Sequence, residues 1–174
     1  MFAVAFPLNT CAAQEIPRED VVYTSSSWQI PGWNILLGVD SCSYMVGIMY
    51  PTLYLYSAFT DEWIPYLAES YRWVDKYTLE LKIRSQAKWW DGKPITAKDV
   101  KYSAELGKKY TIPWATPMWD YITEVKAVDD RTVQIITSED KLNYFQILAI
   151  LFQQNLFVLP EHRWSALEAE LGGK

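Results

Sequence analysis

The sequence is poor in the residues that carry most metal and covalent chemistry. Its 174 residues include one histidine, His162, and two cysteines, Cys11 and Cys42. A single histidine excludes a histidine-rich metal site, and two widely separated cysteines do not form a metal-binding or redox motif. The sequence also lacks the nucleophile elbow, the zinc-protease helix, the phosphate loop and the glycine-rich dinucleotide fingerprint. We therefore expect neither an enzyme nor a bound cofactor or metal.

Two other features are scarce: positive charge and long apolar runs. The 16 basic residues are outnumbered by 21 acidic ones, which gives a net charge of −5, and no cluster of lysine and arginine occurs. This distribution argues against a nucleic-acid-binding surface. No stretch is long and apolar enough to cross a bilayer as a helix. Half of the residues are apolar, so a chain of this length can form the core of one domain.

Aromatic residues are abundant, with nine tryptophans and twelve tyrosines. A surplus of indole rings is typical of a protein that holds flat-faced ligands, but it is equally compatible with a tryptophan-rich core. Composition alone leaves both interpretations open for each tryptophan.

The most informative stretch runs from Leu79 to Leu106. Apolar residues alternate with polar ones from Leu79 to Ile83, which predicts a half-buried strand. Asp91-Gly92 predicts a tight turn, and Thr96 with Asp99 three residues later has the spacing of a helix capping box. The stretch therefore predicts a strand, a turn and a capped helix that extends to about Lys109.

This stretch resembles the signature of the extracellular solute-binding proteins of family 5, the oligopeptide-, dipeptide-, nickel- and oligosaccharide-binding components of ABC importers. The matching residues stand in one register: Ile83-Arg84, Trp89, Asp91-Gly92, Pro94, Thr96-Ala97, Asp99-Val100 and Tyr102-Ser103. Outside it, Pro65 to Ser70 and Pro160 to Trp164 also resemble elements of the family. The resemblance covers about Val21 to Trp164.

The resemblance implies an α+β fold of the periplasmic binding protein type (class II, cluster C). It implies that 14–174 is the N-terminal part of the solute-binding domain: 14–35 as the first strand and loop of lobe I, 36–160 as a β-rich subdomain, and 161–174 as a return helix into lobe I. Family members have two lobes and several hundred residues, so we expect this chain to be a truncated copy.

The resemblance also implies partners and a location. We expect an oligosaccharide or oligopeptide ligand, ABC permease subunits in the membrane, no nucleic acid, and a monomer when the protein is full length. The location is expected to be periplasmic or otherwise extracytoplasmic. Residues 1–13 resemble the second half of a secretory signal peptide, although no basic residue precedes their apolar run. A disordered terminus is the alternative, and membrane association through the permease or through a lipid on Cys11 stays open.

The loop after the first strand carries three of the four candidate ligand-binding residues. In the family this loop contacts the ligand, so the resemblance assigns binding to Trp28, Gln29 and Trp33. The fourth candidate, Trp114, lies in a second aromatic loop, where relatives place an aromatic residue facing the cleft. The alternative for each tryptophan is packing within the subdomain itself.

Several other elements are predicted from local pattern. Residues 71–84 and 122–137 each predict a hairpin, turning at Asp75-Lys76 and at Asp129-Asp130. Residues 52–57 and 156–159 predict short strands, and 43–50 and 141–152 predict helices. We expect Trp63, Trp73 and Trp89 to pack and Trp90 to be exposed. His162 is expected to make a polar contact at a helix start rather than to act as a base.

Two further functions stay open at this stage. A secreted carbohydrate-binding module, or a fragment of a carbohydrate-active enzyme, would share the tryptophan content but would need a flat aromatic platform or a pair of catalytic carboxylates. A chain without independent function would expose the surface that normally meets the rest of lobe I. The family signature favours the binding protein over both.

Overall fold

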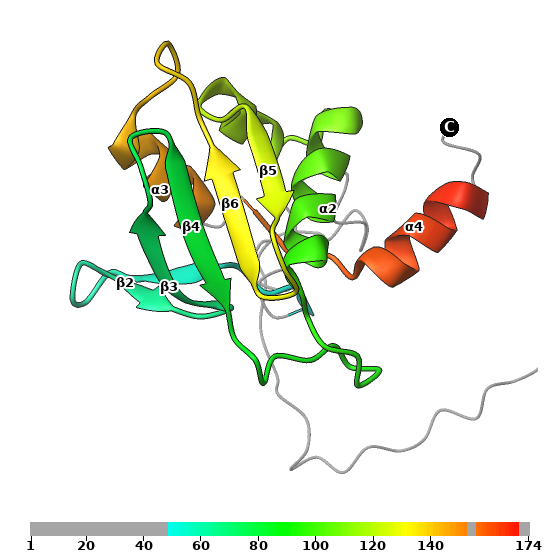
Figure 1. Ribbon diagram of the computed structural model, residues 1–174. Coiled ribbons are helices and arrows are strands. Elements are labelled where there is room, and N and C mark those ends of the chain that lie inside the picture. Colours follow the sequence, from blue (N-terminus) through cyan, green and yellow to red (C-terminus); the bar gives the residue numbers. More distant parts are fainter. Residues whose placement is uncertain (1–48, 153–155, 171–174) are drawn as a thin grey trace, which may run out of the picture.

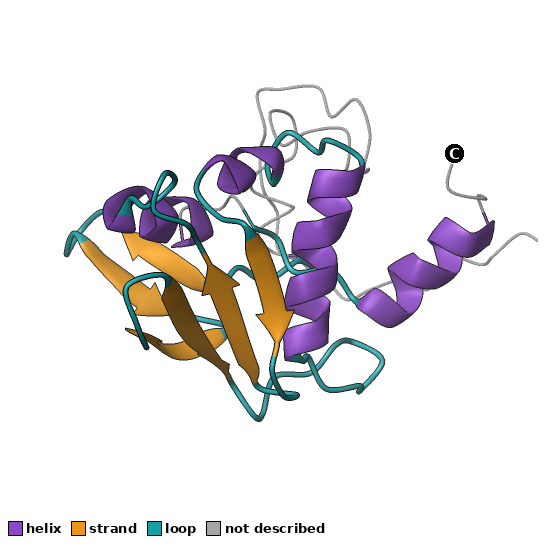
Figure 2. Cartoon of the chain, turned by 45° about the horizontal axis from the view of Figure 1, so that its top comes forward, coloured by secondary structure: helices purple, strands orange, loops and turns teal. Residues whose placement is uncertain are grey.

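The computed structural model describes residues 49–152 and 156–170, and its main feature is a four-stranded antiparallel sheet in the order β3-β4-β6-β5 (Figure 1). Helices lie beside this sheet, as Figure 2 shows, except the last one, α4 (Glu161–Glu170), which projects away from the sheet and contacts α2 (Ala97–Lys109); strands and helices segregated in this way form an α+β arrangement. The four strands are β3 (Ala68–Trp73), β4 (Thr78–Ile83), β5 (Glu124–Ala127) and β6 (Thr132–Ile136). A separate two-stranded sheet contains β1 (Tyr54–Ser57) and β2 (Glu62–Pro65). The helical elements are α2 (Ala97–Lys109), the 3₁₀ helix η3 (Thr116–Asp120), α3 (Tyr144–Phe152) and α4 (Glu161–Glu170).

Both predicted hairpins of the main sheet are confirmed. Strands β3 and β4 pair antiparallel across the turn at Asp75, whose carboxylate accepts a hydrogen bond from the backbone N–H of Tyr77 at 2.7 Å. Strands β5 and β6 pair in the same way, and Asp129 accepts from the N–H of Arg131 at 2.8 Å. An aspartate that caps its own turn fixes the hairpin register locally.

The two faces of the sheet differ as the alternation in β4 predicts. Leu79, Leu81 and Ile83 are fully buried in the hydrophobic core. On the opposite face, Arg72 donates two hydrogen bonds to the carboxylate of Glu80, at 3.0 and 2.7 Å, and Gln134 donates a third at 3.2 Å. The hydrogen bonds from Arg72 and Gln134 lower the pKa of Glu80. The sheet therefore has one apolar face and one polar face.

The core beside β1 and α3 is largely aromatic. The Phe152 ring lies 4.0 Å from the Tyr54 ring and 5.6 Å from the Trp63 ring, centroid to centroid. Trp73 meets Tyr144 edge to face at 4.6 Å. The predicted packing roles of Trp63 and Trp73 agree with these contacts, and the predicted helix over 141–152 is confirmed as α3.

One predicted strand is wrong. Residues 156–159 are buried, at 0 or 1% exposed, but they belong to no strand. Their backbone hydrogen bonds go elsewhere: the N–H of Val158 donates to the carbonyl of Pro51 at 2.9 Å, and the N–H of Leu159 donates to Ser103 Oγ at 2.7 Å. A buried apolar run was correctly identified, but its backbone is satisfied by single contacts to two segments far away in the sequence.

Some predictions concern residues outside the described part of the chain. They are the leader-like 1–13, the first strand at 21–24 and all but the end of the predicted helix 43–50. The boundaries at 14, 36 and 161 stay predictions as well. None of the described helices has the length and apolar character needed to cross a membrane.

Candidate functional site

The strand–turn–helix stretch forms as predicted, and its key residues are structural. Gly92 has a φ of +84°, a backbone conformation that disfavours other residues, and its N–H donates to the carbonyl of Trp89 at 3.0 Å. The N–H of Trp89 donates in turn to the carbonyl of Lys93 at 2.8 Å, which closes the turn. The signature around Asp91-Gly92 thus specifies a loop geometry.

The residues that cap α2 also bind the segment 159–161. Asp99, 4% exposed, accepts hydrogen bonds on Oδ2 from the N–H and the hydroxyl of Thr96, at 2.8 and 3.1 Å. Its other oxygen accepts from the N–H of Glu161 at 2.9 Å. One turn later, buried Ser103 donates to the Asp99 carbonyl and accepts from the N–H of Leu159. Asp99 and Ser103 of the family signature therefore join α2 to 159–161.

His162 makes the polar contact at a helix start that the sequence predicts. Its Nε2 lies 2.7 Å from Asp91 Oδ2, and Arg163 Nε lies 3.8 Å from the same oxygen. The hydrogen bond to His162 is the main cause that lowers the pKa of Asp91. Helix α4 is thus tied at its first turn to the Asp91 loop.

A second polar cluster joins the far end of α4 to α2. The carboxylate of Glu168 accepts hydrogen bonds from Lys109, from the Tyr110 hydroxyl at 2.8 Å and from the Tyr102 hydroxyl at 3.1 Å. Lys109 first and Tyr110 second lower the pKa of Glu168. None of the residues of α4 is fully buried, so these polar contacts contribute a large part of the interaction that holds α4 to α2.

Of the four predicted ligand-binding residues, the structure describes one. Trp114 is 3% exposed, and its ring meets that of Phe157 edge to face at 5.5 Å. This position agrees with the alternative in which Trp114 anchors its loop in the core. Trp28, Gln29 and Trp33 lie outside the described residues, so the predicted grouping of the tryptophans on one concave side stays a prediction.

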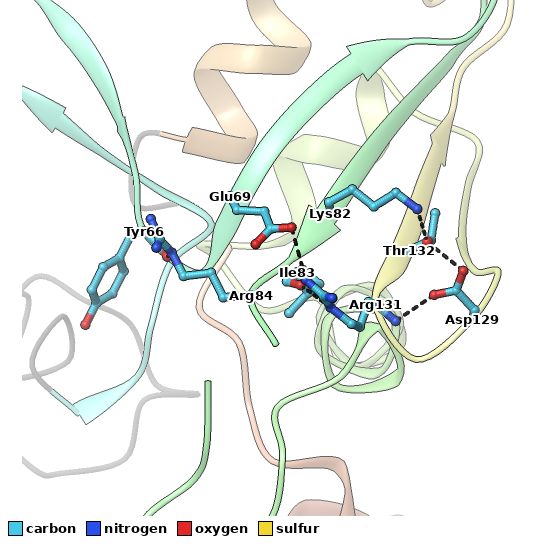
Figure 3. A network of polar contacts seen from close by, with 8 residues as sticks. All are labelled: Tyr66, Glu69, Lys82, Ile83, Arg84, Asp129, Arg131 and Thr132. Carbon is cyan, nitrogen blue, oxygen red and sulfur yellow. Dashed lines mark hydrogen bonds and ion pairs between the residues drawn. The ribbon is translucent and has the colours of Figure 1, made fainter. Parts of the chain in front are cut away.

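A network of charged and polar groups lies at the end of the sheet where β4 ends and β6 begins (Figure 3). Arg131 pairs with Glu69 at 3.0 Å, and Thr132 donates to Asp129 at 2.7 Å while accepting from Lys82 at 2.6 Å. The hydrogen bonds from Thr132 and from the backbone of Arg131 lower the pKa of Asp129. Each charge in the network has a partner, which suits a structural role at the hairpin turn.

A cavity of about 350 Å³ lies beside the Asp91 loop and is not predicted by the sequence. Six of its lining residues are Met49, Tyr66, Arg84, Lys88, Trp89 and Trp90, and we call it the Trp90 pocket. Trp89 is 5% exposed and Trp90 is 70% exposed, as their predicted roles require. Arg84 donates hydrogen bonds to the carbonyls of Tyr66 and Pro65, at 2.5 and 3.1 Å. Figure 3 shows Arg84 beside Tyr66.

The described part of the chain holds no cluster of three or more histidine, cysteine, aspartate or glutamate side chains that could bind a metal ion. Its hydrogen-bonded carboxylates serve caps, turns and ion pairs.

The chain belongs to the bacterial extracellular solute-binding proteins, family 5, because the model of the family's middle region matches residues 62–168. The match spans both main-sheet hairpins, α2 and most of α4. Family 5 consists of transport components that bind solutes without transforming them, and its members act outside the cytoplasm.

Known relatives support the assignment. A protein of Agrobacterium fabrum named peptidoglycan-binding protein YepA is 32% identical over 97 residues, which are 55% of this chain and 15% of the relative. A mannohexaose-bound periplasmic oligopeptide-binding protein from Thermotoga maritima has 32% identity and a TM-score of 0.59, covering 68% of this chain and 21% of that one. The nonapeptide-bound AppA of Bacillus subtilis has a TM-score of 0.61 and 24% identity over 78% of this chain and 26% of its own, and thus shows the fold alone.

The matched relatives are much longer than this chain, which spans about a fifth of their length or less in the Agrobacterium and Thermotoga proteins.

Proposed function

We propose that the chain is part of the extracytoplasmic solute-binding component of an ABC importer. The observation that carries this proposal is the family match over residues 62–168, together with the antiparallel sheet and capped helix that the match encompasses. In such a protein two lobes close around the solute by a hinge motion and present it to the permease. The permease subunits in the membrane are the proposed partner, and the full-length protein acts as a monomer.

The described residues supply the rigid part of this mechanism. The buried face of the sheet, the aromatic core around Phe152 and the joint between α2 and 159–161 hold the subdomain together without a ligand. A rigid scaffold is what a hinged receptor needs, because loops can then present their side chains with little loss of entropy on binding. We assign residues 36–160 to this β-rich subdomain.

The ligand is an oligosaccharide of the cello- or manno-oligomer type, with an oligopeptide as the alternative. The nine tryptophans favour a sugar, because sugar rings present apolar faces that indole rings cover. The Thermotoga relative, described as mannohexaose-bound, is consistent with this choice. The peptide-bound Bacillus protein has the same fold, so the fold does not decide between the two classes.

Trp28, Gln29 and Trp33 are the proposed ligand contacts. Several aromatic contacts, each worth about 0.5–1.5 kcal/mol beyond area, together with buried polar contacts would supply the roughly 8 kcal/mol of micromolar binding. Trp114 belongs to the same proposed set, but its burial against Phe157 favours support of the aromatic loop over direct contact.

Uptake by whole cells tests the function. We expect disruption of the gene to reduce the uptake of radiolabelled mannohexaose or cellohexaose, and re-expression to restore it. Re-expression of a variant with Trp28→Ala and Trp33→Ala should restore less, whereas Trp73→Phe, which changes a packing residue, serves as the control. Unchanged uptake of both sugars and of a labelled hexapeptide after disruption would refute the transport function. Loss of peptide uptake alone would refute the sugar assignment.

A further inference from the structure

The Trp90 pocket is lined by two basic side chains that have no carboxylate partner among the described residues. The chain carries a net charge of −5, yet two cationic side chains, Arg84 and Lys88, line the pocket. Neither forms an ion pair with a carboxylate within the described residues, since Arg84 donates to backbone carbonyls. The acid nearest in sequence to Lys88, Asp91, is occupied by His162 and Arg163. The pocket therefore has positive charge that no described acid neutralises.

The walls of the pocket are aromatic and partly open. Trp90 is 70% exposed and stands edge to face against Trp89, with ring centroids 6.1 Å apart. Tyr66 and Met49 are 44% and 53% exposed and complete the apolar part. An indole that exposes most of its surface offers a flat face for stacking, and burying that face is favourable at roughly 25 cal/mol per Å².

One buried polar group at the pocket is unsatisfied. The indole Nε1 of Trp89 is inaccessible to solvent and has no hydrogen-bond acceptor in the described structure. A buried N–H without an acceptor costs about 1–3 kcal/mol, and a tryptophan N–H usually finds a partner. This observation is independent of the charge, and it concerns a residue that lines the pocket.

We propose that the Trp90 pocket binds a carboxylate-bearing sugar, with the sugar ring stacked on Trp90 and its carboxylate placed between Arg84 and Lys88. A hydroxyl or carboxylate oxygen of the sugar would accept from the Trp89 N–H after a small shift of the ring. The volume of about 350 Å³ lies at the lower end of small-molecule sites, roughly 300–1,000 Å³, and suits one ring. A peptide end offers the carboxylate but not the flat ring, and a neutral sugar offers the ring but not the charge.

This site goes beyond the proposed transport function. All of its residues lie in the described part of the subdomain, so it does not depend on Trp28, Gln29 or Trp33. Its ligand also differs from the neutral oligomers expected for transport. Failure of one proposal therefore leaves the other standing.

Titration calorimetry of the full 174-residue chain with trigalacturonate at low ionic strength tests the inference. We expect saturable binding that weakens at least threefold when salt is raised to 0.5 M, because the charge attraction is screened. Maltotriose, the neutral sugar, and trialanine, the peptide carboxylate, should bind at least tenfold more weakly. Absence of saturable trigalacturonate binding, or equal binding of maltotriose, would overturn the proposal, and tighter binding of trialanine would assign the pocket to peptides instead.

Two variants locate the binding. Trp90→Ala and Lys88→Gln change side chains that are exposed and make no hydrogen bond to another residue, so both should fold normally by far-ultraviolet circular dichroism. Each should weaken trigalacturonate binding at least fivefold, and Lys88→Gln should also reduce the salt dependence. Lys98→Gln, which removes an equal charge from an exposed position of α2 outside the pocket lining, should leave binding unchanged. Equal effects of Lys88→Gln and Lys98→Gln would show that net charge, and not this pocket, attracts the ligand.

Discussion

Replacement of Asp99 by alanine is the most informative test of how the subdomain is held together. The side chain is 4% exposed and makes three hydrogen bonds, two to Thr96 and one to the N–H of Glu161. Asp99 is the third residue of α2, and loss of its hydrogen bond from the N–H of the N-cap residue Thr96 costs about 1 kcal/mol. The N–H of Glu161 would also lose its acceptor, which adds about 1–3 kcal/mol where water does not replace it. We therefore expect Asp99→Ala to lower the free energy of unfolding by about 2–4 kcal/mol.

Urea unfolding followed by tryptophan fluorescence measures this loss. Small proteins change their stability by about 1–3 kcal/mol per molar urea, so the midpoint should fall by roughly 1–2 M. Asp120→Ala is the matched control, because Asp120 is an exposed aspartate at the end of η3 without a hydrogen bond to its side chain. A surface change of that kind should stay within about 0.5 kcal/mol. An Asp99→Ala midpoint equal to that of Asp120→Ala would refute the proposed joint between α2 and residue 161.

Three further outcomes follow from single contacts. Lys109 is the main group that lowers the pKa of Glu168 in the folded chain. The stability that Glu168 contributes is therefore fully present above its unfolded pKa of about 4.3, and it is lost as the pH falls through its folded pKa. Glu168→Gln should flatten this acid-side loss in unfolding curves, and an unchanged slope would contradict the cluster. Burial raises the pKa of Tyr54 to about 12, so stability should decline as pH rises from about 10, its unfolded value, to about 12; Tyr54→Phe should remove that decline. A Cβ on Gly107 would lie 2.2 Å from Cβ of Ala115, so Gly107→Ala should destabilise by about 1–2 kcal/mol despite the better helix propensity of alanine. Ala115→Gly in the same chain should recover most of the loss, and no recovery would mean that the crowding lies elsewhere.

The elements that sequence analysis predicted correctly are those specified by neighbouring residues. The capping box of Thr96 and Asp99, the turn at Gly92 and the two aspartate-capped hairpins each depend on a few adjacent positions. Local signals of this kind survive in the fold because packing and propensity favour the same structure.

The elements that were missed depend on distant partners. Strand β2 is mostly exposed, so its residues 62–65 lack the alternation that marks a strand. The run 156–159 has the apolar content of a strand, but Pro51 and Ser103 supply its partners. Neither relationship is visible within a short window of sequence.

In the candidate site, too, features set by neighbouring residues were predicted and features set by distant residues were not. The predicted burial of Trp89 and exposure of Trp90 are both confirmed. These two neighbours differ because only the first of them packs into the core before the turn. The Trp90 pocket itself was not predicted, because Tyr66 and Arg84, which also line it, lie elsewhere in the sequence. Trp114 illustrates a different limit: an indole in a proline-rich loop suits a ligand face and a core equally well, and only the position of Phe157 favours the core.

The hydrogen bond between the N–H of Val158 and the carbonyl of Pro51, at 2.9 Å, joins two segments that lie on either side of the main sheet and α2 in the sequence. A unit whose two ends meet can be inserted into a loop of a host domain without separating the host's own elements, and its length can change without altering the junction. The stretch from residue 51 to residue 158 therefore has the closed ends that such an insertion or exchange requires.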